Sequence, residues 1–221
     1  EQIKAYLQDA WDEWEIPPNF VLLAGDQDGE LIVPCYTAQA NISWHASDNQ
    51  YVNWQDGGDF GEWIPEGFIG RLPAAENRHL EHMVAKIVGY ESDPYIEEPW
   101  VEGGVMIANG VQSCIASNIA VREMMVNYGY NRNRITEEYA DYHQGQRPNI
   151  NLIQTGINNG VGFINFRGYN NWGDFLPNHI NGLRNGWKLP IVGGMVCGTN
   201  DFRNFFVDQR PECRGETFLR A

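Results

Sequence analysis

Hydrophobic and polar positions follow one another along this chain in blocks that predict strands and helices in turn. Short apolar runs bounded by turn residues predict strands at residues 20–26, 67–73, 104–109, 134–141, 161–168 and 189–197. Apolar residues at helical spacing predict helices at 3–14, 76–91, 117–130 and 150–160, and a helical turn at 178–187. This alternation predicts an α/β fold with a mainly parallel sheet and right-handed crossovers.

The strand prediction at residues 20–26 rests on the uninterrupted apolar run FVLLA. Such a run is typical of a parallel strand that is covered on both faces. Residues 27–66 are polar and rich in Gly and Asp, which predicts long loops with a short hairpin. Their aromatic side chains form either a small core that anchors the loops or an exposed binding surface. These side chains are Trp44, Tyr51, Trp54, Phe60 and Trp63.

Composition excludes some classes of function. The chain has 221 residues, a formal charge of −14 and a pI near 4.6, which argues against nucleic-acid binding. No apolar run approaches the roughly 20 residues of a membrane-spanning helix. The four cysteines are widely spaced without a CxxC pair, which is neither a zinc pattern nor a disulfide framework. The sequence allows a single disulfide bridge and does not say which cysteines would form it. Because the sequence opens on EQIKAYLQ without Met and stops at FLRA, we expect a segment of a longer chain.

Two strands end in glycine-flanked turns that carry candidate chemistry. The first reads VGFINFRGYNNWG and the second PIVGGMVCGTNDF, with Cys197 in its turn. In parallel sheets, sites form beyond the carboxyl ends of the strands, where Cys197 falls. A cysteine acts as a nucleophile in its thiolate form, which a neighbouring imidazole usually generates. The candidate site therefore needs a base near Cys197.

An ordered series of motifs along the whole chain resembles the gingipain (C25) family of cysteine peptidases, without the family's N-terminal portion. The motifs are FVLLAGD, SDNQY, DGGDFGEWIPEGFIGRLP, MVAKIVGYE, YGY, NFRGY, VCGTNDF and GETFLRA. The resemblance implies a caspase-like sandwich, in which helices flank a mainly parallel sheet. It also implies two subdomains, at residues 1–96 and 97–221, the first of them lacking its N-terminal part.

The resemblance also implies roles for individual residues. Cys197 takes the position of the nucleophile, whereas Tyr169 stands where the family has its catalytic histidine. Asn109 falls near the position of the acidic catalytic residue, and Cys114 near the acidic residue that sets specificity in the arginine-specific members. A tyrosine, which titrates near pH ~10, cannot hold a positive charge or carry protons well at neutral pH. The chain thus keeps the nucleophile and lacks the base.

Another histidine is a possible replacement for the missing base. His179 lies in the connection that leads to the Cys197 strand, so it is the first candidate; the alternative is an ordinary histidine on a surface loop. His143 falls in a polar loop, and His45 in the aromatic loop. His79 and His82 lie on the helix predicted at residues 76–91.

Two acidic loops, GDQDGE and DGGDFGE, group carboxylates with glycines. Calcium takes six to eight oxygen ligands, which flexible loops of this kind supply, and gingipain-like enzymes bind structural calcium. Neither loop matches the EF-hand pattern, and a solvated acidic turn is the alternative. The candidate calcium ligands are Asp26, Asp28, Glu30, Asp56 and Asp59.

Three functional hypotheses follow. The first is a gingipain-like pseudopeptidase with a structural or binding role in an extracellular or cell-surface protein, a location that the resemblance implies. The second is an active cysteine endopeptidase that acts on peptides or proteins through a displaced base such as His179. The third is a calcium-rigidified assembly module of a surface layer or filament, which binds copies of itself or other surface proteins. None of the three hypotheses includes a nucleic-acid partner, and none places a membrane span within this segment.

Overall fold

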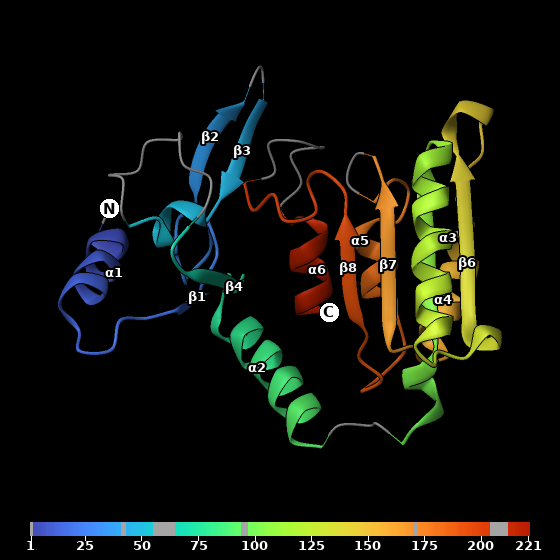
Figure 1. Cartoon of the computed structure of the whole chain (residues 1–221), viewed down its shortest axis with the longest axis horizontal. Coiled ribbons are helices and arrows are strands. Elements are labelled where there is room, and N and C mark those ends of the chain that lie inside the picture. Colours follow the sequence, from blue (N-terminus) through green and yellow to red (C-terminus); the bar gives the residue numbers. More distant parts are fainter. Residues whose placement is uncertain (1, 41–42, 55–64, 94–96, 170–171, 204–211) are drawn as a thin grey trace.

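The computed structural model describes residues 2–40, 43–54, 65–93, 97–169, 172–203 and 212–221, without the side chains of residues 38–45 (Figure 1). The helices are α1 (Gln2–Glu13), α2 (Asn77–Ser92), α3 (Gln112–Asn127), α4 (Ile150–Asn158), α5 (Pro177–Asn181) and α6 (Arg214–Arg220). The strands are β1 (Phe20–Ala24), β2 (Tyr36–Ala40), β3 (Ser43–Ser47), β4 (Phe68–Leu72), β5 (Gly104–Gly110), β6 (Ile135–Asp141), β7 (Phe163–Gly168) and β8 (Ile191–Met195). None of these helices is long and apolar enough to cross a membrane.

The main sheet has four parallel strands in the order β6-β5-β7-β8, with helices on both faces (Figure 1). Successive side chains of a strand point to opposite faces. On β5, Val105 and Ile107 therefore pack with α4, whereas Met106 packs with Met125 of α3. All of β5 is buried, because strands and helices surround it. The predicted α/β sandwich with a parallel sheet is thus confirmed.

The first half of the chain contains two smaller sheets. β1 and β4 pair in parallel, and β2 and β3 form an antiparallel hairpin within the predicted loop region. The prediction that the first strand is covered on both faces is wrong: Phe20 is 77% exposed and Leu22 64% exposed, while Leu23 is buried. The reason is that β1 pairs only with β4 among the described strands, so one face of this pair is open. Phe20 and Phe68 stack on each other there, 5.2 Å between ring centroids.

The aromatic side chains near the hairpin support the small-core interpretation where they are described. Tyr51 and Trp54 are buried. Trp11 of α1 stacks on Trp54, with 4.4 Å between ring centroids, and Tyr36 contacts Tyr51 edge-on at 4.9 Å. The side chain of Trp44, together with Phe60 and Trp63, lies outside the described part of the chain.

Two predicted boundaries differ from the structure in ways that matter for the site. α3 begins at Gln112, not at Ser117, since the backbone N–H of Ile115 already donates to the carbonyl oxygen of Val111. The side chain of Asn118, inside the helix, donates to the carbonyl oxygens of Ile107 and Cys114. β8 ends at Met195, so Cys197 lies wholly in the following turn.

Arg220, at the end of α6, joins the two halves of the chain. Its guanidinium donates to the carbonyl oxygen of Pro73 over 2.9 Å and forms an ion pair with Asp26, which follows β1. Asp26 and Arg220 are both buried, and Glu216 of α6 lies on the same guanidinium at 3.4 Å. Because a buried charge needs a partner, these contacts hold α6 against the first half. The predicted division at residue 96 stays a prediction.

Candidate active site

The turns after β5, β7 and β8 meet at one edge of the main sheet. Because the strands are parallel and in register, Asn109 pairs with Gly168, and Arg167 pairs with Met195. Tyr169 and Cys197 therefore follow adjacent strands. The backbone N–H of Tyr169 donates to the carbonyl oxygen of Asn109 over 3.0 Å, which ties the turn after β7 to the end of β5.

The Tyr169 ring packs against the end of β5. It is 48% exposed, and a Cβ added to Gly110 would lie 2.7 Å from its Cδ2 atom. The same Cβ would lie 3.4 Å from Sγ of Cys114, which is buried in the first turn of α3. Gly110 has φ +149°, so a side chain would be strained there as well as crowded. The structure thus brings Tyr169 together with Cys114 and Asn109, three of the predicted site residues.

Asn109 lies fully buried beneath the turn that carries Tyr169. Its Nδ2 donates to the hydroxyl of Tyr142 over 2.8 Å, and its Oδ1 has no hydrogen-bond partner among the described residues. Gly173 presses on the same amide, since a Cβ there would lie 1.6 Å from Nδ2. The position near which the resemblance places an acid is therefore a neutral, buried amide that supports the turn.

Arg167 fastens the carboxyl ends of β7 and β8 to each other. Its guanidinium donates to the carbonyl oxygens of Gly168, over 3.0 Å, and Met195, over 3.1 Å. Both carbonyls directly precede the two candidate turns. This positioning contact was not predicted, because an arginine in NFRGY has many possible partners in the sequence.

Trp172 makes a second connection, between the turns themselves. It is fully buried and has a φ of +57°, in the left-handed region, which is sparsely populated by residues other than glycine. Its ring stacks on Phe166 at 4.4 Å, and its indole N–H donates to Oγ1 of Thr199 over 3.0 Å. The hydroxyl of Thr199 in turn donates to the carbonyl oxygen of Val196, over 3.1 Å. The residues on both sides of Cys197 are thus held by the turn that follows β7.

Cys197 is the one exposed thiol of the chain. All four cysteines are free, and Cys35, Cys114 and Cys213 are buried. Burial raises the pKa of the Cys35 thiol to about 11, and it also raises the pKa of Cys213, the residue before α6. A thiol reagent therefore reaches Cys197 selectively in the folded protein.

His179 serves as a local cap and packing residue of α5. Its Nδ1 accepts a hydrogen bond from the backbone N–H of Leu176 over 3.1 Å, and its ring lies 6.0 Å from that of Phe175. Gln154 of α4 donates to its carbonyl oxygen. No described contact joins His179 to Cys197, so its predicted role as a base stays a prediction.

The described contacts of His79 and His82 also do not involve Cys197. His82 lies 3.0 Å from the carbonyl oxygen of Arg220, and His79 lies 3.1 Å from a carboxylate oxygen of Glu76. The β2–β3 hairpin, however, lies beside the Cys197 turn: Ala46 lines a cavity of about 250 Å³ together with Val196 and Gly198. The backbone of His45 is next to Ala46 on β3, a proximity that sequence reasoning missed because it joins distant segments.

In the first acidic loop, the carboxylate of Asp26 already has partners within the protein. Its Oδ1 accepts the backbone N–H of Gln27 over 2.7 Å, and its Oδ2 pairs with Arg220. Asp28 and Glu30 are exposed. Within the described ranges, no three His, Cys, Asp or Glu side chains cluster as metal ligands; the remaining candidates, Asp56 and Asp59, lie outside those ranges. Asp26 thus does not fit a calcium ligand while Arg220 holds it.

Comparison with known proteins gives the family. Residues 1–221 match the sequence pattern of peptidase family C25. The chain belongs to peptidase family C25. Gingipain R2 of Porphyromonas gingivalis is 27% identical over 170 residues, 71% of this chain and 21% of that protein. Lys-gingipain of the same organism is 25% identical over 229 residues, 99% of this chain and 12% of that protein.

Two solved structures share the C25 fold. The Arg-specific cysteine proteinase gingipain R superposes with a TM-score of 0.77 at 22% identity, covering 99% of this chain and 48% of that one. The complex of the pro- and mature domains of RgpB from Porphyromonas gingivalis gives 0.76 at 22% identity, covering 99% and 49%. This C25 chain therefore spans about half of those structures and a smaller share of the curated relatives.

Proposed function

We propose that this C25 domain does not hydrolyse peptides and that it serves a binding or structural role in an extracellular or cell-surface protein. The observation that carries the proposal is Tyr169, which follows β7 in the turn next to Cys197. The relatives named above include an Arg-specific cysteine proteinase, so the proposal sets this chain apart from them in activity while it keeps their fold.

The chemistry of Tyr169 supports this proposal. A cysteine peptidase needs a group that takes the thiol proton and later gives it to the leaving amine. A phenol that titrates near pH ~10 does neither well at neutral pH. The ring also packs toward Gly110 and Cys114, and the buried amide of Asn109 offers no negative charge to orient a base.

The rate at which iodoacetamide alkylates Cys197 tests the proposal. Because the other thiols are buried, mass spectrometry of the folded protein reports on this residue alone. We expect the rate to be slow at neutral pH and to rise with pH, as it does for an ordinary thiol. The Cys197→Ala variant sets the background. An apparent pKa well below ~7 would contradict the proposal, because some other group would then ionise the thiol.

Turnover is the second test. We expect the wild-type chain and Cys197→Ala to cleave fluorogenic arginine and lysine peptides equally slowly. Cleavage that depends on Cys197 would establish the active-peptidase hypothesis instead. His179→Ala and His45→Ala, made separately, would then identify which connection supplies the base.

A further inference from the structure

Four of the sequence motifs meet at Arg71, which lies on β4 in the GRLP segment. Its Nε and Nη2 donate to the two carboxylate oxygens of Asp48, in SDNQY, each over 2.7 Å. Its Nη1 donates to the carbonyl oxygens of Gly25, which ends FVLLAG, over 2.8 Å, and of Val33 over 2.7 Å. Its guanidinium carbon lies 5.2 Å from the centre of the Phe202 ring, in VCGTNDF. Segments far apart in the sequence thus contact one side chain.

Burial and bond geometry hold the guanidinium of Arg71 in one orientation. The side chain of Arg71 is 3% exposed and that of Asp48 is 11% exposed. A bidentate pair with a carboxylate fixes the plane of a guanidinium, and breaking such a buried pair is costly. A planar guanidinium also attracts the face of an aromatic ring, more so when water is excluded. Arg71 therefore gives the ring of Phe202 a rigid surface to pack on.

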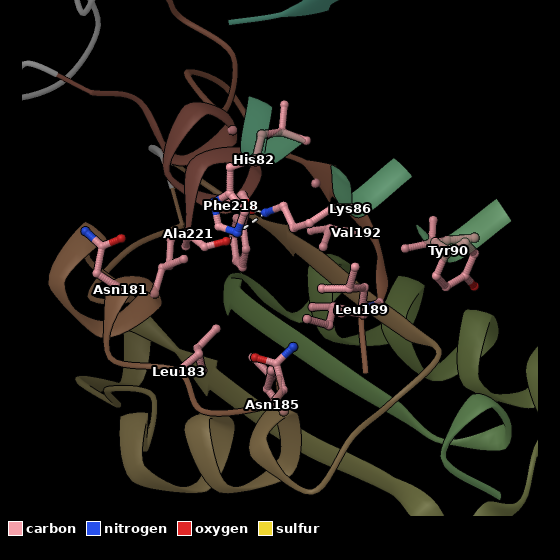
Figure 2. A pocket seen from close by; sticks show the side chains of 18 of the residues that line it. His82, Lys86, Tyr90, Asn181, Leu183, Asn185, Leu189, Val192, Phe218 and Ala221 are labelled. Carbon is pink, nitrogen blue, oxygen red and sulfur yellow. Dashed lines mark hydrogen bonds between the residues drawn. The ribbon is translucent and has the colours of Figure 1, made fainter. Parts of the chain in front are cut away.

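The first part of the cysteine turn, residues 196–202, is fixed by the second half of the chain. The carbonyl oxygen of Thr199 accepts the backbone N–H of Gly215, on α6, over 2.7 Å. Trp172, which donates to the Thr199 hydroxyl, packs against Phe218 of the same helix, with 5.0 Å between ring centroids. Both rings line a cavity of about 840 Å³, where Figure 2 shows Phe218. α6 and the turn after β7 thus hold the turn at Thr199.

The first half of the chain meets the other end of the same turn. Asp48 directly follows β3, and Ala46 on β3 lines the cavity of about 250 Å³ together with Val196 and Gly198. The base of the β2–β3 hairpin and the cysteine turn are therefore neighbours on two sides, at this cavity and at the ring of Phe202.

We propose that Arg71 is a positioning residue for the cysteine turn: it holds Phe202, and through Phe202 the loops of the first half set the conformation of the segment around Cys197. Asp48 and the two carbonyl oxygens hold Arg71 in turn. The inference goes beyond the proposed function, because it holds with or without peptide turnover. It makes Arg71 a second joint between the halves of the chain, at the candidate site, besides the contact of Arg220 with Asp26.

A nitroxide attached to Cys197 by a methanethiosulfonate reagent tests this role in the whole chain. Because the other thiols are buried, the label reports on the cysteine turn by electron paramagnetic resonance. The Cys197→Ala form of each variant gives the signal of any other labelled thiol. Phe202→Leu removes the ring and keeps the ion pair, Phe202→Tyr keeps the ring, and Arg71→Met removes the guanidinium. Tyr51→Phe is the matched control, since it removes a hydrogen bond to Pro34 in the same loops without changing Arg71 or Phe202.

We expect Phe202→Leu and Arg71→Met each to raise the ratio of mobile to immobile nitroxide about two- to fivefold, the change that corresponds to the loss of one cation–π contact. The double variant should show no further rise, because both substitutions remove the same contact. Phe202→Tyr and Tyr51→Phe should keep the wild-type spectrum, and thermal melting checks that all variants are folded. Phe202→Leu carries the test if Arg71→Met does not fold.

Three results would overturn the proposal. The first is an unchanged spectrum in Phe202→Leu, which would show that the ring does not hold the turn. The second is an additive rise in the double variant, which would show that Arg71 and Phe202 act separately. The third is an equal rise in Tyr51→Phe, which would mean that any loss of stability in these loops loosens the turn.

Discussion

The indole N–H of Trp172 donates to the hydroxyl of Thr199 over 3.0 Å, across the two turns that carry Tyr169 and Cys197. The hydroxyl of Thr199 in turn donates to the carbonyl oxygen of Val196, the residue directly before Cys197. The conformation of the cysteine turn therefore depends on a side chain from the turn after β7 and not on its own sequence alone. This relationship leads to the first prediction.

Trp172→Phe should change the reactivity of Cys197. Phenylalanine keeps most of the ring that stacks on Phe166 but has no N–H, so the hydrogen bond to Thr199 is lost. This loss should lower the free energy of unfolding by about 1–2 kcal/mol. We expect urea denaturation to show this loss and the alkylation rate of Cys197 to change at fixed pH. Trp187→Phe is the matched control, since Trp187 is half exposed and lies in the connection between α5 and β8, outside both turns. An unchanged alkylation rate in Trp172→Phe would show that the hydrogen bond does not position the thiol.

Tyr169→His should not create a peptidase. The new imidazole would have no carboxylate at Asn109 to orient it, because the amide there binds Tyr142. We expect no cleavage of arginine or lysine peptides above the level of the double variant Tyr169→His/Cys197→Ala. Adding Asn109→Asp, which has nearly the same volume, tests whether the missing charge is the reason. Turnover by Tyr169→His alone would mean that the rest of the machinery is intact.

Arg220→Ala should destabilise the chain strongly. The substitution leaves the carboxylate of Asp26 buried without its positively charged partner and removes the bond to Pro73, which should cost about 3–5 kcal/mol. Arg78→Ala breaks the exposed pair with Glu76 and should cost less than about 1 kcal/mol. Urea denaturation compares the two. A cost for Arg220→Ala as small as that of Arg78→Ala would show that α6 does not depend on this contact.

The stability of the chain should fall as pH rises from about 5 to about 8. Burial, and next the charge of Asp26, raises the pKa of Glu216 to about 8, whereas an unfolded glutamate titrates near pH ~4.3. In this window the folded state holds a proton that the unfolded chain has released, so each rise in pH favours unfolding. The decrease should be on the order of 2–4 kcal/mol in urea denaturation.

Glu216→Gln is the control for this pH dependence. It keeps an acceptor for the backbone N–H of Cys213 and removes the titration, so its stability should change little over the same pH range. Lys86 does not interfere with this measurement. Burial lowers its pKa to about 8, so its titration makes stability rise with pH only between about pH 8 and the ordinary pKa of a lysine. An equal decline in Glu216→Gln and wild type would assign the effect to another group.

Chelation of calcium should leave the melting temperature of the chain unchanged, because we expect no cation at the first acidic loop. Asp26 is held by Arg220, which supplies the positive charge that a cation would bring. We expect the same melting temperature with EDTA and with added calcium. An increase with calcium that Asp28→Asn abolishes would support the predicted calcium module. If the increase persists in that variant and disappears in Asp56→Asn, the second loop binds the ion.

Much of the architecture could be predicted from local patterns. Apolar runs at residues 104–109 and 161–168 predicted two central strands of the main sheet, and the order of the motifs predicted the family. The exposure of Phe20 and Leu22 could not be predicted, because an apolar run does not show what covers it. The start of α3 was missed because the fold, and not the local pattern, places Asn118 inside the helix, where it donates to the carbonyl oxygen of Ile107 on β5.

The site was predictable only where a residue lies at a strand end. Tyr169 and Cys197 each follow a predicted strand, but the strand–helix–strand alternation alone does not make these strands neighbours, since β6 and β7 are also consecutive and are separated by β5. The contacts that hold them do not follow from this alternation either, because Arg167 and Trp172 reach across to segments far along the chain. Asn109 was predicted at the end of a strand, and the resemblance placed it near the acidic position, but its bond to Tyr142 depends on how two turns pack in space.

The close contact between Gly173 and Asn109 limits how this site can evolve. A side chain at position 173 would overlap the Asn109 amide, and a longer side chain at position 109 would push against the backbone of Gly173. A glutamate at 109 thus has no room until the turn after β7 is rebuilt. If the domain lacks peptidase activity, as proposed, the acidic group that position 109 could regain is therefore limited to aspartate as long as Gly173 and its turn keep their present arrangement.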